Sequence, residues 1–162
     1  MAVVVRRATR DDASRVAEMA MKLVEQHRDY DPVRFARLAD IEGMAWFYGG
    51  QTETDGAAVL VADEDGGIVG FGYVAYEVKN YADLSVSAAR LHDIYVDDAV
   101  RHKGVGKLLL DAAITVAKQM GASKMMLSVA AQNTLAEKFF WQAGFRTTMH
   151  EMMLVLAEPN KI

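Results

Sequence analysis

The chain has 162 residues, of which 52% are apolar, and its formal net charge at pH 7 is -4. This length allows one domain with a substantial core, so we expect a single domain over residues 1–162. The acidic balance argues against nucleic acid or an anionic membrane as the main partner, because both favour an excess of Lys and Arg. Without cysteine there is no disulfide, thiolate nucleophile or Cys-ligated metal site, and we expect no metal at all. No apolar run approaches the length of a membrane span or signal peptide, which predicts a cytoplasmic protein.

The first third of the chain combines one strand pattern with three helix patterns. Residues 2–8 (AVVVRRA) are typical of a strand, and apolar residues recur at helical spacing over residues 13–27. The Asp-Pro pair that opens residues 31–38 resembles an N-cap followed by proline at the first helical position, which predicts a second helix there. A short helix is expected at residues 41–48, ended by the two glycines that follow.

The middle of the chain is dominated by strand patterns. Two β-rich runs, residues 57–64 and 68–78, flank an Asp-Gly-Gly turn and predict a hairpin. A loop at residues 79–88 leads to a further strand at residues 89–98 (ARLHDIYVDD). Strict alternation along this strand predicts two faces, one with Leu91, Asp93 and Tyr95, the other with His92, Ile94 and Val96.

The clearest helix lies at residues 105–120, where apolar side chains recur in steps of three and four and a capping glycine follows. A strand at residues 123–130, a helix at residues 133–144 and one or two closing strands at residues 145–157 complete the chain. The order predicts an α/β (α+β layered) fold with helices packed on a central sheet.

The loop before the helix at residues 105–120 has the chemistry of an anion site. The first N–H groups of that helix have no intrahelical acceptor, and the helix dipole is positive at this end. Gly104 and Gly106 allow a bulky anion to approach the backbone. Positive charge is added by Arg101, His102, Lys103 and Lys107. A phosphate or pyrophosphate is the natural ligand, unless the glycines only shape a tight turn and the basic residues are solvated.

Two common phosphate-binding motifs are excluded at this loop. A P-loop requires Ser or Thr after its lysine, whereas Lys107 precedes Leu108. A dinucleotide-binding motif requires a small third residue, and Leu109 stands at that position.

Residues 101–106 (RHKGVG) resemble the Arg/Gln-x-x-Gly-x-Gly/Ala motif of the GNAT superfamily of acyl-CoA-dependent N-acetyltransferases. The motif follows a strand of the form LHDIYV and opens a long amphipathic helix. Later residues that match at the family's spacing are Asn133, Ala136, Phe139, Gly144 and Phe145. The resemblance implies a central mixed, mostly antiparallel sheet flanked by helices, and an acetyl-CoA-dependent N-acetyltransferase. A catalytically idle acyl-CoA-binding regulatory domain is the alternative.

The resemblance also implies where acetyl-CoA binds. The pantetheine arm is expected to pair with the backbone of Ile94, Tyr95 and Val96, where an N–H group would polarise the thioester carbonyl. Asn133 is expected to contact this arm or to cap the following helix, and Phe140 to pack against the arm or simply in the core. The amides implied to hold the pyrophosphate are those of Arg101, His102, Lys103, Gly104, Val105 and Gly106, with Lys107 adding charge.

The remaining chemistry is proton transfer, because the acceptor amine must lose a proton and the leaving thiolate must gain one. His92 stands where many family members carry Glu, and an imidazole titrates near neutrality. Asp93 is expected to act through a water, although ordinary structural roles fit both residues. The usual Tyr general acid is replaced by Phe140, which has no proton to donate. Tyr95, Tyr73 or water is left for that role.

Acids and aromatics in residues 25–50 and 77–90 are expected to select the acceptor, and they suit a cationic amine. The named candidates are Glu25, Tyr30, Trp46 and Tyr48. A small-molecule amine, a polyamine, a lysine side chain and a peptide N-terminus all fit, and an ordinary helix surface with a few buried rings is the alternative. The apolar run at residues 152–157 is expected to be core or a strand shared in a homodimer.

Overall fold

The computed structural model describes residues 2–82 and 84–157. The chain divides into two compact units, one formed by Met1–Leu23 and Ala39–Ser128, the other by Val24–Leu38 and Val129–Ile162. A single domain over the whole chain stays a prediction.

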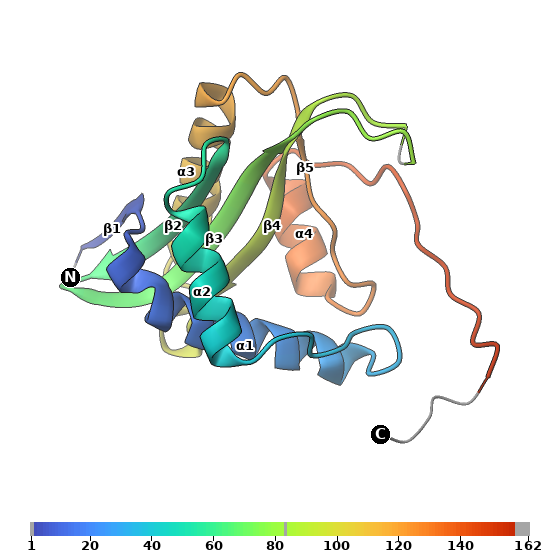
Figure 1. The fold of residues 1–162 in the computed structure, drawn as a ribbon, viewed down its shortest axis with the longest axis horizontal. Helices are drawn as coiled ribbons and strands as arrows, with labels where there is room; N and C mark the ends of the chain where they lie inside the picture. Colours follow the sequence, from blue (N-terminus) through green and yellow to red (C-terminus); the bar gives the residue numbers. More distant parts are fainter. Residues whose placement is uncertain (1, 83, 158–162) are drawn as a thin grey trace. The chain divides into compact units, whose positions relative to one another are not determined.

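The first unit is built on a five-stranded sheet in the order β1-β2-β3-β4-β5 (Figure 1). Successive pairs from β1 to β4 are antiparallel, and β4 and β5 are parallel, so the expected mixed, mostly antiparallel sheet is confirmed. Its strands are β1 (Val3–Arg7), β2 (Ala57–Glu64), β3 (Gly67–Glu77), β4 (Ala88–Val96) and β5 (Met125–Met126). The last is shorter than predicted, because only two residues of 123–130 pair with β4.

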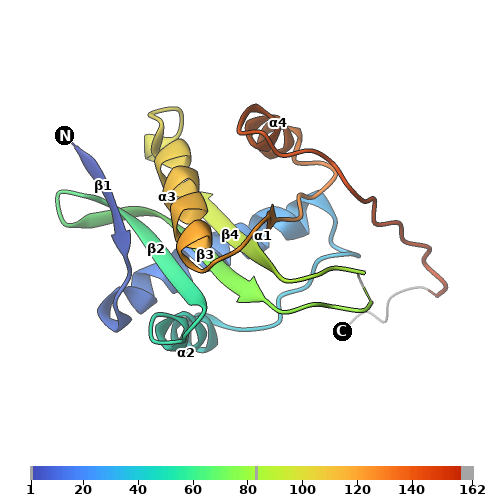
Figure 2. The same ribbon diagram turned by 90° about the horizontal axis from the view of Figure 1, so that it is seen from above.

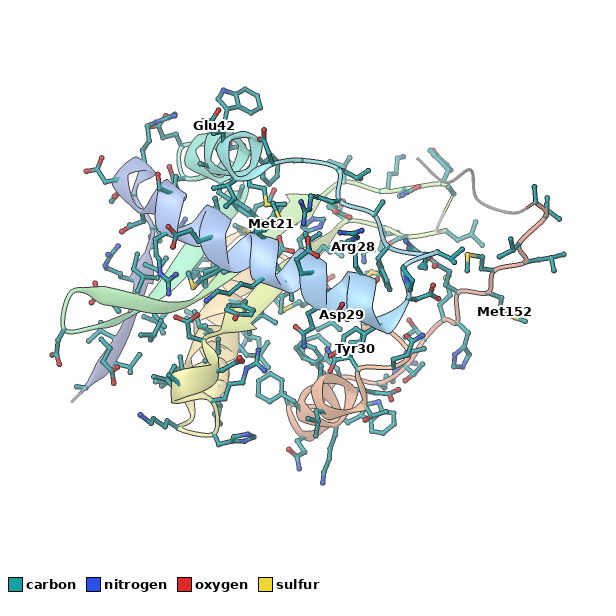
Figure 3. The ribbon with its side chains drawn as sticks, turned by 90° about the horizontal axis from the view of Figure 1, so that it is seen from below. Met21, Arg28, Asp29, Tyr30, Glu42 and Met152 are labelled. Atoms are coloured by element: carbon teal, nitrogen blue, oxygen red, sulfur yellow. The ribbon has the colours of Figure 1, made fainter. Side chains whose placement is uncertain are left out.

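Helices cover both faces of this sheet. A short 3-10 turn, η1 (Arg10–Asp12), leads into α1 (Ala13–Tyr30), which packs on one face together with α2 (Ile41–Gln51). Figure 3, seen from that side, shows α1 crossing the sheet at Met21 beside α2. Figure 2 shows α3 (Val105–Gln119) on the opposite face. The core under α1 and α2 includes Val16, Met19, Tyr48, Val59, Val61, Phe71, Tyr73 and Tyr95.

The predicted helix at residues 31–38 is wrong, because the segment makes a single turn. The Asp31 carboxylate does accept the N–H groups of Val33 (3.1 Å) and Arg34 (3.0 Å), as an N-cap would. One helical hydrogen bond then forms, from the Phe35 N–H to the Asp31 carbonyl (3.0 Å). A helix gains stability only by propagation beyond such a first turn, and residues 35–40 have no regular structure.

The glycines expected to end the next helix lie inside it instead, since α2 continues to Gln51. A Cβ added at Gly49 would stand 3.4 Å from the Cβ of Ala13, so this glycine allows α2 to lie close to the start of α1. At this position close packing has overridden the weak helix propensity of glycine.

The second unit contains α4 (Thr134–Gln142), which ends before Gly144 in the left-handed conformation, φ 98°, as predicted. The closing strands predicted at residues 145–157 are wrong. These residues have no regular structure, and residues 146–157 are exposed, so the run at 152–157 is not core. A strand forms only where a neighbour accepts its hydrogen bonds, and within the described residues this segment has no such neighbour.

Candidate active site

A β-bulge at His92 sets the geometry of the site. In the pairing of β3 with β4, Tyr73 lies opposite Asp93 and Val74 lies opposite Leu91, so His92 is the extra residue. The His92 ring stacks on the Tyr73 ring with 5.2 Å between centroids and 22° between planes. Since Tyr73 belongs to the core under α1 and α2, His92 lies on that face of the sheet too.

The bulge overturns the strict alternation expected along this strand. Asp93 and Tyr95 stand opposite Tyr73 and Phe71, and therefore share their face. His92 joins them there instead of sharing a face with Ile94 and Val96. An inserted residue shifts the two-residue period by one, and a bulge therefore brings side chains together that alternation separates.

His92 is held by an ion-pair network with β3. Its Nε2 lies 2.9 Å from Oε1 of Glu77, and the second carboxylate oxygen of Glu77 lies 3.1 Å from Nε of Arg90. A carboxylate can only accept, so Nε2 carries the hydrogen and the lone pair of a neutral ring stands on Nδ1. The network fixes the ring with its basic nitrogen directed away from Glu77.

Two tyrosines complete this face. The Tyr48 hydroxyl donates to Oδ2 of Asp93 (2.9 Å), and the Tyr73 hydroxyl donates to Oε1 of Gln51 (2.9 Å). Burial, followed by the charge of Asp93, raises the pKa of both phenols above the ordinary value of 10.0. Both hydroxyls therefore keep their protons at neutral pH.

The loop before α3, which is expected to be the cradle for an anion, leaves its backbone open to approach. Gly104 takes the N-cap position with φ 83°, a left-handed conformation that favours glycine, and it offers no side-chain acceptor to the first N–H groups of the helix. A Cβ at this position would meet nothing within 4 Å, so the approach to the backbone is open. Arg101 donates from Nε to the Val96 carbonyl (3.1 Å), which places its charge beside the cradle. Lys107, in the first turn, pairs with Asp111 (2.5 Å).

The neighbouring edge of β4 is open where the pantetheine arm is expected. The parallel pairing with β5 consists of Ala89 with Met125 and Arg90 with Met126. Among the described residues, β5 pairs with no part of β4 beyond Arg90. The backbone of residues 94–96 can therefore accept an added strand on that side, next to the cradle.

The other predicted site residues have structural contacts. Asn133 caps α4, its Oδ1 accepting the Ala136 N–H (3.2 Å), and Phe140 packs against Phe139 and Phe145. Glu25 pairs with Arg37 and Arg28, which lower the pKa of its carboxyl. Tyr30 accepts from Nε2 of Gln26 (2.8 Å). These four site residues lie in the second unit; Trp46 is exposed on α2 in the first.

Residues 20–145 match the family model described as acetyltransferase (GNAT) family. The chain belongs to this family. As a GNAT protein it is an N-acetyltransferase with acetyl-CoA as the acetyl donor. The donor set of the first unit fits this co-substrate, because free helix amides, a glycine without Cβ and nearby basic side chains suit a pyrophosphate, and an open strand edge suits an amide-bearing arm.

Similar proteins agree with this assignment. The uncharacterized N-acetyltransferase YhfO of Bacillus subtilis is 28% identical over 97% of this chain and 99% of its own length. An L-methionine sulfoximine/L-methionine sulfone acetyltransferase of Salmonella typhimurium is 27% identical over 65% of this chain and 58% of its own. Among solved structures, a BH1408 variant from Bacillus halodurans has TM-score 0.81 and 22% identity over 94% of this chain and 99% of its own. The aminoglycoside N-acetyltransferase AAC(6')-Iy, in complex with CoA, has TM-score 0.75 and 17% identity over 95% of this chain and 94% of its own. These two likenesses show the shared fold.

The sequence analysis also addressed metal sites and membrane-spanning segments. Within residues 2–82 and 84–157, no group of three or more His, Asp or Glu side chains is placed to hold a metal ion. No helix in this part of the chain is long and apolar enough to cross a membrane.

Sequence reasoning missed Gln51 and the pairing of Glu77 with His92. The signal that indicates the bulge is the pair of polar residues between Leu91 and Ile94. Two adjacent polar residues in an otherwise apolar strand do not fit strict alternation, and a bulge explains how both reach one face.

Proposed function

We propose that this GNAT enzyme acetylates the primary amine of a cationic small molecule by direct attack within a ternary complex, with His92 as general base. The observation that carries the proposal is the bulge in β4. It gathers His92, Asp93 and Tyr95 on the face that also holds Tyr48 and Tyr73, beside the open edge of β4. No cysteine is available to carry a covalent acetyl intermediate, which favours direct transfer.

His92 removes the proton that keeps the acceptor as an ammonium. The free Nδ1 takes this proton, while Nε2 continues to donate to Glu77. The carboxylate stabilises the imidazolium that forms, and Arg90 holds the carboxylate in place. Glu77 is thus a positioning residue and His92 the catalytic base.

Other groups on this face act on the donor side. Acetyl-CoA supplies the activated acetyl group, and a backbone N–H within residues 94–96 stabilises the charge that develops on its carbonyl oxygen. We assign proton return to Tyr95, because the hydroxyls of Tyr73 and Tyr48 are already committed to Gln51 and Asp93. Tyr95 thus takes the role of the usual Tyr general acid, whose position is occupied by Phe140 in this chain.

The acceptor class follows from charge and aromatic character. The Glu77 carboxylate pairs with His92, and the Asp93 carboxylate accepts from Tyr48. The rings of Tyr48 and Tyr73 lie 5.9 Å apart, and Tyr73 stacks on His92. Carboxylates and aromatic rings together attract a cation, and the rings can hold it by cation-π contact. Names of similar proteins support a small molecule, since they include an L-methionine sulfoximine/L-methionine sulfone acetyltransferase and a putative phosphinothricin acetyltransferase.

The test is acetyl transfer by the purified protein to a panel of amino acids, aminoglycosides, polyamines, lysine peptides and peptide N-termini. We expect turnover with a small cationic amine and a fall in kcat/KM of about 10²–10⁴-fold in His92→Gln, with loss of the acidic limb of the pH profile. His150→Gln, the same change at an exposed histidine, should behave like the wild type. Glu77→Gln should alter the pH profile, because the imidazolium loses its counter-charge.

Preference for a lysine peptide or a peptide N-terminus would contradict the acceptor class. If His92→Gln keeps the wild-type rate and pH profile, His92 is not the general base.

A further inference from the structure

Two acids stand at the start of the loop before α3. Asp97 and Asp98 follow β4 directly, and both precede Gly104, the N-cap of α3. The pyrophosphate of acetyl-CoA carries negative charge, and like charges repel. A carboxylate at this place therefore weakens the binding of acetyl-CoA unless its charge is screened by water or neutralised by a cation.

The two acids differ in how far water reaches them. The Asp98 side chain is 81% exposed and pairs with Arg101 of the same loop (2.8 Å), so solvent and salt screen its charge. The Asp97 side chain is only 17% exposed, and a charge in that position is screened much less. Asp97 is therefore the acid whose charge a bound anion meets.

Asp97 is neutralised by two cations of α1. Nη2 of Arg15 donates to Oδ2 of Asp97 (2.5 Å), and Nζ of Lys22 lies 3.4 Å from Oδ1. Arg15 and Lys22 are two helical turns apart and so share one side of α1, the helix that crosses the sheet in Figure 3. Both oxygens of the carboxylate thus face a positive charge.

The ion pair of Arg15 with Asp97 is fixed by its surroundings. Nε of Arg15 donates to the Ile68 carbonyl (3.2 Å). The Asp97 N–H donates to the Val69 carbonyl (2.9 Å), and the Asp97 carbonyl accepts the N–H of Val100 (3.1 Å), whose side chain is buried. The pair joins α1 to β3 and to the first residue of the loop, so its geometry is set before any ligand binds.

We propose that Arg15 and Lys22 set the affinity for acetyl-CoA by neutralising Asp97 at the start of the loop. They are positioning residues, since they act on the co-substrate through Asp97. Asp97 ties the loop to α1, and its two cations prevent this tie from repelling the pyrophosphate. The inference rests on the assignment of the loop before α3 as the cradle for acetyl-CoA, and it is independent of the acceptor.

Calorimetric titration with acetyl-CoA tests the charge effect. We expect Arg15→Gln to raise the Kd about tenfold, because the carboxylate of Asp97 keeps its charge and loses its nearer cation. The value of kcat at saturating acetyl-CoA should not change, because the proton-transfer groups are unaltered. Lys22→Gln, at a more exposed position and a longer distance, should raise the Kd less. Arg10→Gln removes the same charge from an arginine that pairs with Glu53, and its Kd should be that of the wild type.

A double variant separates charge from structure. Arg15→Gln combined with Asp97→Asn removes both charges, and we expect its Kd to return to within about threefold of the wild type. A merely structural role of Arg15 predicts instead that the double variant binds no better than Arg15→Gln. S-acetylpantetheine, a donor without the pyrophosphate, gives a second readout, because its kcat/KM should be equal in the wild type and Arg15→Gln.

A wild-type Kd in folded Arg15→Gln, or a double variant that binds no better than Arg15→Gln, would overturn the inference. If Arg15→Gln does not fold, a wild-type Kd in Lys22→Gln has the same meaning. Gly104→Trp separates this failure from a failure of the cradle: if it binds acetyl-CoA like the wild type, the cradle assignment is wrong and the inference falls with it. Loss of binding in Gly104→Trp beside a wild-type Kd in Arg15→Gln would leave the cradle in place and reject the role of Arg15.

Discussion

At the scale of single residues, the hydrogen bond from Tyr48 to Asp93 ties α2 to the bulged strand. The pKa of Tyr48 is raised in the folded chain by burial and by Asp93. Above pH 10 the unfolded chain therefore loses this proton while the folded chain keeps it, so the free energy of unfolding falls as the pH rises. We expect Tyr48→Phe to flatten this alkaline loss, measured by urea denaturation between pH 8 and about 11.

The same variant should be less stable at neutral pH, by about 1–3 kcal/mol, because the half-buried Asp93 carboxylate loses a donor. Tyr76→Phe, a more exposed tyrosine on β3, is the matched control and should change neither quantity. Equal alkaline slopes in wild type and Tyr48→Phe would mean that Tyr48 does not contribute to the pH dependence.

Residue types in the sequence predicted the chemistry of this site better than its geometry. His92, Asp93 and Tyr95 were recognisable as a cluster of titratable groups on one strand. Their arrangement depended on a bulge, which is set by pairing with β3 and so by residues about twenty positions away. The role of Tyr48 in substrate binding stays a prediction, whereas the hydrogen bond from its hydroxyl to Asp93, between residues 45 positions apart, was not predicted.

At the scale of elements, Gly70 allows β3 to lie close to both β4 and α3. A Cβ at this position would lie 2.8 Å from the carbonyl oxygen of Tyr95 and 3.1 Å from Cδ1 of Leu109. The backbone of β4 cannot give way cheaply, so we expect Gly70→Ala to lower the free energy of unfolding by about 1–3 kcal/mol. Thermal unfolding should show this as a lower Tm.

Gly50→Ala provides the opposite control, because this glycine lies within α2 and a Cβ there meets nothing within 4 Å. Alanine should stabilise the helix by about 0.5–1 kcal/mol. If Gly70→Ala is as stable as the wild type, the close contact between β3 and β4 does not constrain the site as described.

Elements with a strong local period were predicted well, and elements that depend on distant partners were not. The helix of α3 and the hairpin of β2 and β3 follow from side-chain spacing and turn residues within each segment. The segment at 145–157 has equally strong strand composition, but composition supplies no hydrogen-bonding neighbour. In residues 31–38 the Asp31 carboxylate caps the first turn, but no further helical hydrogen bonds extend that turn into a helix.

At the scale of the whole molecule, an acidic chain has a polyanionic co-substrate, and we expect it to be bound through one local arrangement. The net charge of -4 gives no general attraction for acetyl-CoA. We therefore expect binding to depend on oriented backbone amides at the start of α3 and on the few cations beside them. The family model spans residues 20–145 and thus takes in parts of both compact units.

The most direct measurement is calorimetric titration of the purified protein with acetyl-CoA, with ATP and NAD alongside, repeated with Gly104→Trp. Gly66→Trp is the matched control, because Gly66 also has positive φ, 88°, and open space around it, but lies in the hairpin turn. We predict selective binding of acetyl-CoA by the wild type and Gly66→Trp, and its loss in a folded Gly104→Trp. Undiminished binding in Gly104→Trp, or none in the folded wild type, would contradict the assignment of this loop as the cradle for acetyl-CoA.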